Sequence, residues 1–142
     1  MDLRESIKNQ TQASLQLAQH LVSTEAKDKN LVFSPLSIHV VLGLIASGSK
    51  DETLNQLLDF LKSKSSDVLN SLSSQLVTLI FADGSSLGGP RLSFANGVWL
   101  DQTLSLKPSF KEIVDNVYKA ASNPVDFQTK VSLISIFNYR TH

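Results

Sequence analysis

The side chains of this chain that could perform chemistry are few and lie far apart. The sequence has no cysteine, which removes a thiol nucleophile, a disulfide framework and a cysteine-based zinc site. Its three histidines, His20, His39 and His142, have no second histidine or carboxylate at metal-ligand spacing. The sequence therefore predicts neither a metal site nor a cofactor.

His39 is the histidine with the best setting for chemistry, because it follows a helix start and lies among apolar residues. It could act as a general base, or it could be a core histidine that hydrogen-bonds to nearby backbone. Without a partner in the sequence, we interpret it as a core residue. Ser47 and Lys50 match the S-x-x-K pattern of acyl-transferring serine enzymes, but the companion motifs are absent from the sequence. We therefore predict that the chain is not an enzyme.

Charge and hydropathy patterning exclude two broad classes of partner. Basic and acidic residues number 13 each, so no net field attracts nucleic acid or an anionic membrane. The longest apolar run, residues 38–46, is much shorter than the ~20 residues that span a bilayer. The amphipathic amino terminus lacks the pattern of a signal peptide. We expect a soluble cytoplasmic protein without nucleic-acid or membrane partners.

Two serines in the stretch FSPLSI, residues 33–38, carry a different polar signal. Ser34 can accept hydrogen bonds from the free N–H groups of a helix start, and Pro35 at the first helical position forfeits no hydrogen bond. Ser37 lies one turn inside an apolar helix and needs a partner when it is buried. We interpret Ser34 and Ser37, with Pro35 and Ile38, as a structural latch rather than a catalytic group.

The elements that must position these residues are predicted to be mostly helical. Apolar and small residues at helical spacing predict a helix over about residues 4–23; its expected buried face is Ile7, Thr11, Ser14, Ala18 and Leu21, widened by Leu15 and Val22. Residues 31–33 read as a brief buried strand. The next helix, from Pro35, has apolar residues on all sides, which predicts a central helix. Its small residues predict that something large lies over it: Gly43, Ala46, Ser47 and Gly48.

The remaining segments alternate between outer helices and extended runs. A capping box at residues 49–52 opens a helix with leucines on one face, and Ser66 caps a third helix with an inner face of Leu69, Leu72, Leu76, Leu79 and Ile80. Residues 91–100 read as an interior strand covered on both faces. Pro108 starts a helix with an apolar stripe of Phe110, Ile113, Val114, Val117 and Tyr118, and NPVDF at residues 123–127 is extended. These elements predict an α+β chain.

The stretch FSPLSI resembles the serpin family of serine and cysteine protease inhibitors. The resemblance continues through Gly48 and Thr53, and through LSFANGVWLD, LKPSFKE and YKAASNPVDF at residues 92–101, 106–112 and 118–127. The sequence ADGSSLGGPRLSFANGVWLD, residues 82–101, is similar to the sequences of plant members of the family. We therefore expect an incomplete serpin fold, with an amino-terminal serpin portion in residues 1–130 and a divergent tail in residues 131–142.

What the resemblance implies for function comes from the family. Serpins inhibit as suicide substrates: a serine or cysteine protease cleaves a reactive-centre loop near the carboxyl terminus, and that loop inserts into the main sheet. The family's shutter serines match Ser34 and Ser37. This sequence ends at His142, before such a loop, and its tail has Asn138-Tyr139-Arg140 where the family has Asn-x-Trp. We therefore expect that this chain alone forms no covalent complex with a protease. The resemblance to the family also allows an extracellular location.

Unpaired strand edges suggest an alternative function. If the usual neighbours of the strand around Phe94 are missing, its open edge and the uncharged, β-prone run at residues 131–137 predict self-association. The same edge could pair with another chain, such as a full-length serpin, by β-augmentation. The alternative function is therefore that of an interaction module.

Overall fold

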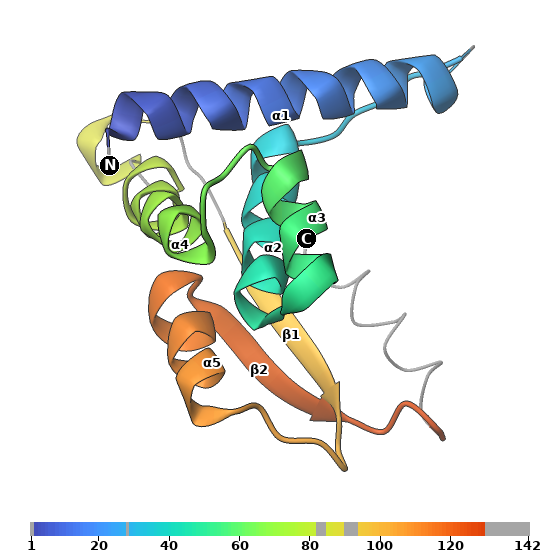
Figure 1. Cartoon of the computed structure of the whole chain (residues 1–142), viewed down its shortest axis with the longest axis vertical. Helices are drawn as coiled ribbons and strands as arrows, with labels where there is room; N and C mark the ends of the chain where they lie inside the picture. Colours follow the sequence, from blue (N-terminus) through green and yellow to red (C-terminus); the bar gives the residue numbers. More distant parts are fainter. Residues whose placement is uncertain (1, 28, 82–84, 90–93, 130–142) are drawn as a thin grey trace.

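A computed structural model describes residues 2–27, 29–81, 85–89 and 94–129. In these residues the chain is mostly helical with one two-stranded sheet, which confirms the α+β class. The elements in chain order are α1 (Leu3–Thr24), α2 (Pro35–Gly48), α3 (Asp51–Phe60), α4 (Ser66–Gln75), β1 (Asn96–Asp101), α5 (Pro108–Glu112) and β2 (Ala120–Val125). Figure 1 shows α1 lying across the ends of α2 and α4, with α5 and most of the sheet farther from α1.

Three shorter helical turns complete the described structure. The π-helical turn η1 (Leu76–Ile80) continues α4, and a second one, η3 (Ile113–Val117), continues α5. The 3₁₀ turn η2 (Ser85–Leu87) lies between α4 and β1. None of the described helices is long and apolar enough to cross a membrane. The predicted tail, from residue 131 onward, lies outside the described residues.

The helix α1 has the predicted extent but buries a different face. Its buried residues are Ser6 and Ala13, whereas Ile7, Leu15 and Val22 are exposed. Small side chains allow the backbone of α1 to lie close to the neighbouring helices α2 and α4, which a row of large side chains would prevent. The predicted buried face of α1 was therefore only partly correct, because Ser14, Ala18 and Leu21 are half-buried while Ile7 and Thr11 are exposed.

The helix α2 supplies residues to two core clusters on different sides of its axis. Val40 and Leu44 pack with Val114, Tyr118 and Ala120, where the predicted stripe of α5 and η3 is confirmed. Ala46 packs with Leu61 and Leu69, which lie at the end of α3 and in α4. These two clusters give the fold its centre.

The prediction that α2 is surrounded by protein was only partly correct. Val41 and Ile45 are each about half exposed. Residues 31–33 form no strand, and Val32 is almost fully exposed. A strand gains its hydrogen bonds from a neighbouring strand, and the described residues place none beside this segment.

The sheet consists of β1 and β2, which pair in parallel from Asn96 opposite Ala120 to Asp101 opposite Val125. The helical crossover through α5 is the connection that parallel neighbours require. Val98 packs against the core on one face, whereas Trp99 points from the other and is 46% exposed. The strand is therefore not covered on both faces within the described residues; residues 91–93 of its predicted range lie outside them.

Two predicted helix starts were wrong in detail. Ser49 donates its hydroxyl proton to the Ile45 carbonyl oxygen at 2.7 Å, so α3 begins after Lys50 without a side-chain cap. The cap of α4 is Ser65, one residue before the predicted Ser66, and it accepts from the backbone N–H of Val68 at 3.4 Å.

The inner face predicted for the third helix ends early. Leu69 and Leu72 are buried, but Leu79 and Ile80 are exposed. The π-helical turn η1 widens the helix, so residues after Gln75 no longer follow the 3.6-residue period used for the prediction. The predicted inner face is therefore confirmed for Leu69, Leu72 and Leu76, which packs against the core cluster, but not for Leu79 and Ile80.

Candidate functional site

The predicted latch residues meet at the amino terminus of α2. The Ser34 hydroxyl oxygen accepts a hydrogen bond from the backbone N–H of Ser37 at 3.2 Å, and the Ser37 hydroxyl donates to the same oxygen at 2.9 Å. Ser34 is exposed, while Pro35, Ser37 and Ile38 are half-buried. Ser34 thus caps α2 as predicted, and the hydroxyl of Ser37 finds its hydrogen-bond partner in Ser34, within the same helical turn.

Replacing Ser34 with alanine should lower the free energy of unfolding by about 1 kcal/mol, because the first turn of α2 loses its only side-chain acceptor among the described residues. Ser37→Ala is the matched control: it removes a hydroxyl from the same pair but keeps the cap, so its effect should be smaller. Urea denaturation followed by circular dichroism measures both. Equal losses in the two variants would contradict the capping role.

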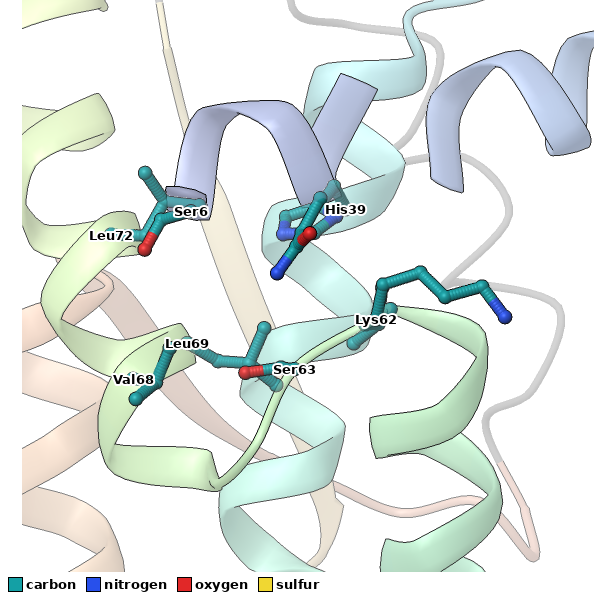
Figure 2. A pocket seen from close by; sticks show the side chains of 9 residues that line it. Ser6, His39, Lys62, Ser63, Val68, Leu69 and Leu72 are labelled. Atoms are coloured by element: carbon teal, nitrogen blue, oxygen red, sulfur yellow. The ribbon is translucent and has the colours of Figure 1, made fainter. Parts of the chain in front are cut away.

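His39 lies beneath α1 and is 4% exposed. It lines a narrow cavity of about 10 Å³, enough for no more than one water molecule. Figure 2 shows His39 across the cavity from Ser6 of α1 and Leu72 of α4, with Lys62, Ser63, Val68 and Leu69 below them. The cavity is therefore a junction between α1, α2 and α4.

The interpretation of His39 as a core residue fits this setting, but its expected hydrogen bond to backbone does not. Neither ring nitrogen has a hydrogen-bond partner among the described residues. Burial lowers the pKa of the imidazole below its ordinary value. The described residues also contain no group of three or more histidine, cysteine or acidic side chains able to hold a metal ion. The hydroxyls of Ser6 and Ser63 line the same cavity, but neither they nor any other described group hydrogen-bonds to the ring, so the structure pairs no nucleophile with His39.

The S-x-x-K pair is not assembled into a site within the described structure. Ser47 faces α4, where its hydroxyl oxygen lies 2.6 Å from Asn70 Oδ1 and 2.9 Å from the Gly43 carbonyl oxygen. Lys50 is exposed at the start of α3. The single hydroxyl proton of Ser47 can serve only one of its two acceptors, and both of them are structural groups.

The sequence did not reveal a buried polar network that joins α2, α4 and the sheet. Tyr118 is 0% exposed, and its hydroxyl donates to Asn70 Oδ1 at 2.9 Å. Burial raises the pKa of Tyr118, which keeps this hydroxyl protonated as a donor. The Tyr118 carbonyl oxygen accepts from Asn96 Nδ2 of β1 at 2.9 Å. Tyr118 therefore connects α4 to β1 directly, and α2 joins the network through the contact between Ser47 and Asn70.

Small residues of α2 make room for this network, as the sequence predicted. A Cβ atom on Gly43 would lie 2.9 Å from the Tyr118 hydroxyl oxygen. A Cβ atom on Gly48 would lie 2.9 Å from Cζ of Phe110. The large groups over α2 are thus the aromatic side chains of Tyr118 and Phe110. The sequence showed only the small residues of α2 that these side chains contact.

Comparisons with known proteins agree on one family. The family described as Serpin (serine protease inhibitor) matches residues 8–138. Serpin-ZX of Arabidopsis thaliana is 55% identical over 130 residues, which are 92% of this chain and 33% of that protein. Serpin-Z4 of the same plant is 47% identical over the same shares. The chain spans about a third of the length of the curated relatives it matches.

Solved structures show the same partial correspondence. Arabidopsis AtSerpin1 in its native stressed conformation has a TM-score of 0.87 and 52% identity, over 97% of this chain and 35% of that chain. Tengpin, a thermophilic serpin in the latent state, has a TM-score of 0.79 over 98% of this chain and 36% of that chain. At 23% identity, Tengpin is similar in fold alone.

Proposed function

The chain belongs to the serpin family, and we propose that it forms the amino-terminal part of a serpin scaffold and does not trap a protease by itself. Members of this family are protease inhibitors rather than enzymes. The observation that carries the proposal is the match to about a third of each relative. The described residues correspond to helices and strands of the fold, and the inhibitory act needs more than these elements.

The small size of the described sheet supports the non-inhibitory part of the proposal. Inhibition in this family needs a larger sheet, into which a cleaved reactive-centre loop inserts as a further strand. Among the described residues the sheet has two strands, β1 and β2, which pair in parallel from Asn96 to Asp101. These two strands are only a part of the sheet that insertion requires.

The latch residues have a place in the same proposal. Ser34 and Ser37 close the amino-terminal turn of α2, in which Pro35 is the first helical residue and Ile38 follows Ser37. Ser34 Oγ already accepts two hydrogen bonds from Ser37, and the residue is exposed, so its hydroxyl proton remains available to a further acceptor. We assign to these four residues the role of the family's shutter, in which a neighbouring sheet segment would bind to the α2 terminus.

Incubation of the 142-residue polypeptide with proteases tests the proposal. Neither a trypsin-like serine protease nor a papain-like cysteine protease should give an adduct that survives SDS gel electrophoresis. A full-length plant serpin run in parallel is the positive control for adduct formation. An SDS-stable adduct of the 142-residue polypeptide would contradict the non-inhibitory proposal.

A second candidate function is that of an interaction module. It is favoured by Trp99, which is 46% exposed on the outer face of a sheet with two described strands. Such a sheet can accept a further strand from another chain, for example a full-length serpin or a second copy. Sedimentation of the labelled polypeptide with and without a full-length serpin tests this idea. A monomer that unfolds cooperatively and does not sediment with the serpin would count against it.

A further inference from the structure

We propose that His39 is a pH-sensitive latch between α1 and the helical core, and that protonation of its ring releases α1 from α2 and α4. This inference concerns the conformational stability of the chain, so it goes beyond the proposed function and holds or fails independently of protease inhibition. It rests on the place of one buried imidazole at the junction of helices (Figure 2).

The position of His39 ties it to α1 in particular. One cavity beside the ring is lined by Ser6 and Asn9 of α1. A second cavity on the ring is lined by Ala13 and Ser14 of the same helix. The two cavities that border the ring therefore extend along α1 from Ser6 to Leu17, while the ring itself belongs to α2.

Among the described residues, the lining of the first of these cavities contains no carboxylate and places no acceptor in hydrogen-bond contact with the ring, although the polar side chains of Ser6, Asn9 and Ser63 lie beside it. A neutral imidazole carries one donor and one acceptor, whereas the cation carries two donors that need acceptors. Neither ring nitrogen has a hydrogen-bond partner among the described residues. Apolar side chains of Leu61, Leu69 and Leu72 line the cavity beside the polar ones. Charging this ring without an acceptor is unfavourable.

Charged groups near the junction do not offset the cost of charging the ring. From the segment between α3 and α4, Lys62 lines the cavity, but its ammonium points away from His39 in Figure 2 and lies 3.9 Å from Asp59 Oδ1. Glu5 of α1 is engaged by Lys64 at 3.0 Å. Asp67 of α4 lines a neighbouring cleft together with Ser6 rather than the His39 cavity. The helix α2 itself contains no ionisable side chain other than His39.

The direction of the pH effect follows from the burial of His39. The pKa of the imidazole is lower in the folded chain than its ordinary value of 6.5. The open state therefore binds more protons, and the closed state loses stability as the pH falls from about 6.5 toward the folded pKa. Each pH unit within that window favours opening by up to about tenfold.

The helix α1 is the element expected to respond. Its only fully buried residues among those described are Ser6 and Ala13, and its apolar Leu17, Ala18 and Leu21 are half-buried, so α1 adds no large, fully buried side chain to the core. The ion pair between Glu5 and Lys64 is largely exposed and contributes little. The core cluster around Val40 and Tyr118 buries many more apolar side chains than the contact of α1 does. Local opening of α1 is therefore easier than unfolding of the whole chain.

Amide hydrogen exchange of the full 142-residue chain at pH 7.5 and pH 5.0 tests the latch. After correction for intrinsic exchange rates, protection of α1 amides should fall by about tenfold at pH 5.0, while amides of η3 and β2 keep their protection. In the same samples, the His39 ring resonance should titrate below the ordinary histidine range. An ordinary titration, unprotected α1 amides at pH 7.5 or an equal loss of protection in all elements would overturn the proposal.

Two variants separate His39 from other groups that titrate. His39→Leu keeps an apolar side chain at the junction and should remove the pH dependence of α1 protection. His20→Gln is the matched control, because His20 is an exposed histidine on α1 itself, and this variant should respond to pH as the unmodified chain does. Retention of the pH dependence in His39→Leu, or its loss in His20→Gln, would overturn the assignment. If His39→Leu does not fold, the ring titration of the unmodified chain still decides.

Discussion

Replacing Tyr118 with alanine should lower the free energy of unfolding by about 4 kcal/mol, because the change opens a cavity in the larger core cluster. Tyr118 is completely buried against Val40, Leu44 and Val114. It also carries the hydroxyl that joins α4 to the segment before β2. Urea denaturation followed by fluorescence of Trp99 measures the loss directly.

Tyr118→Phe divides that loss into packing and hydrogen bonding. The ring stays in place and only the bond to Asn70 is removed, so the expected decrease is about 1 kcal/mol. Asn70 keeps Ser47 as a neighbour at 2.6 Å, which prevents its oxygen from being left without any partner. Leu104→Ala, at a position 65% exposed, is the control and should change stability little. A loss in Tyr118→Ala as small as that of Leu104→Ala would contradict the central position of Tyr118.

The sequence predicts the helices of this chain well where the signal is local. Ser34 and Pro35 determine where α2 begins, because the hydroxyl cap and the fixed φ of proline act within a few residues. The stripe that contains Val114 and Tyr118 follows helical spacing and is buried as predicted. These features need no knowledge of distant parts of the chain.

Features that depend on distant neighbours were predicted less well. Residues 31–33 have strand-forming side chains but lack a neighbouring strand in the described residues, so they remain irregular. Helical periodicity in α1 allowed two faces, and close packing selected the one with Ser6 and Ala13. A pattern of side chains gives the period of an element, whereas contacts decide which of its faces is covered.

The candidate site shows the same division. The hydroxyl of Ser34 acts on its own helix turn and could be predicted. The bond between Asn70 and Tyr118 joins residues 48 positions apart, and neither residue is unusual in its local sequence. The small residues Gly43 and Gly48 predicted a close neighbour but not its identity. The sequence thus predicted a close contact at Gly43 and Gly48, but not that Tyr118 and Phe110 make it.

Gly43→Val, at this close contact, has the second large expected effect. It should lower the free energy of unfolding by about 3 kcal/mol through overpacking. A Cβ atom at this position would already lie 2.9 Å from the Tyr118 hydroxyl oxygen and 3.4 Å from Ser73 Oγ, and the γ-methyl groups of valine need more room still. Replacing glycine in a helix improves helix propensity by only roughly 0.4 kcal/mol, so the clash decides the sign.

A double-mutant cycle can show that the clash is with the Tyr118 hydroxyl in particular. In the Tyr118→Phe background the nearest atom is gone, so Gly43→Val should lose at least about 1 kcal/mol less than in the unmodified chain. Urea denaturation of the two single variants, the double variant and the unmodified chain supplies the four free energies. Because both residues belong to one network, coupling is the expected outcome; effects that add to within about 0.3 kcal/mol would mean that Gly43 and Tyr118 do not share this space.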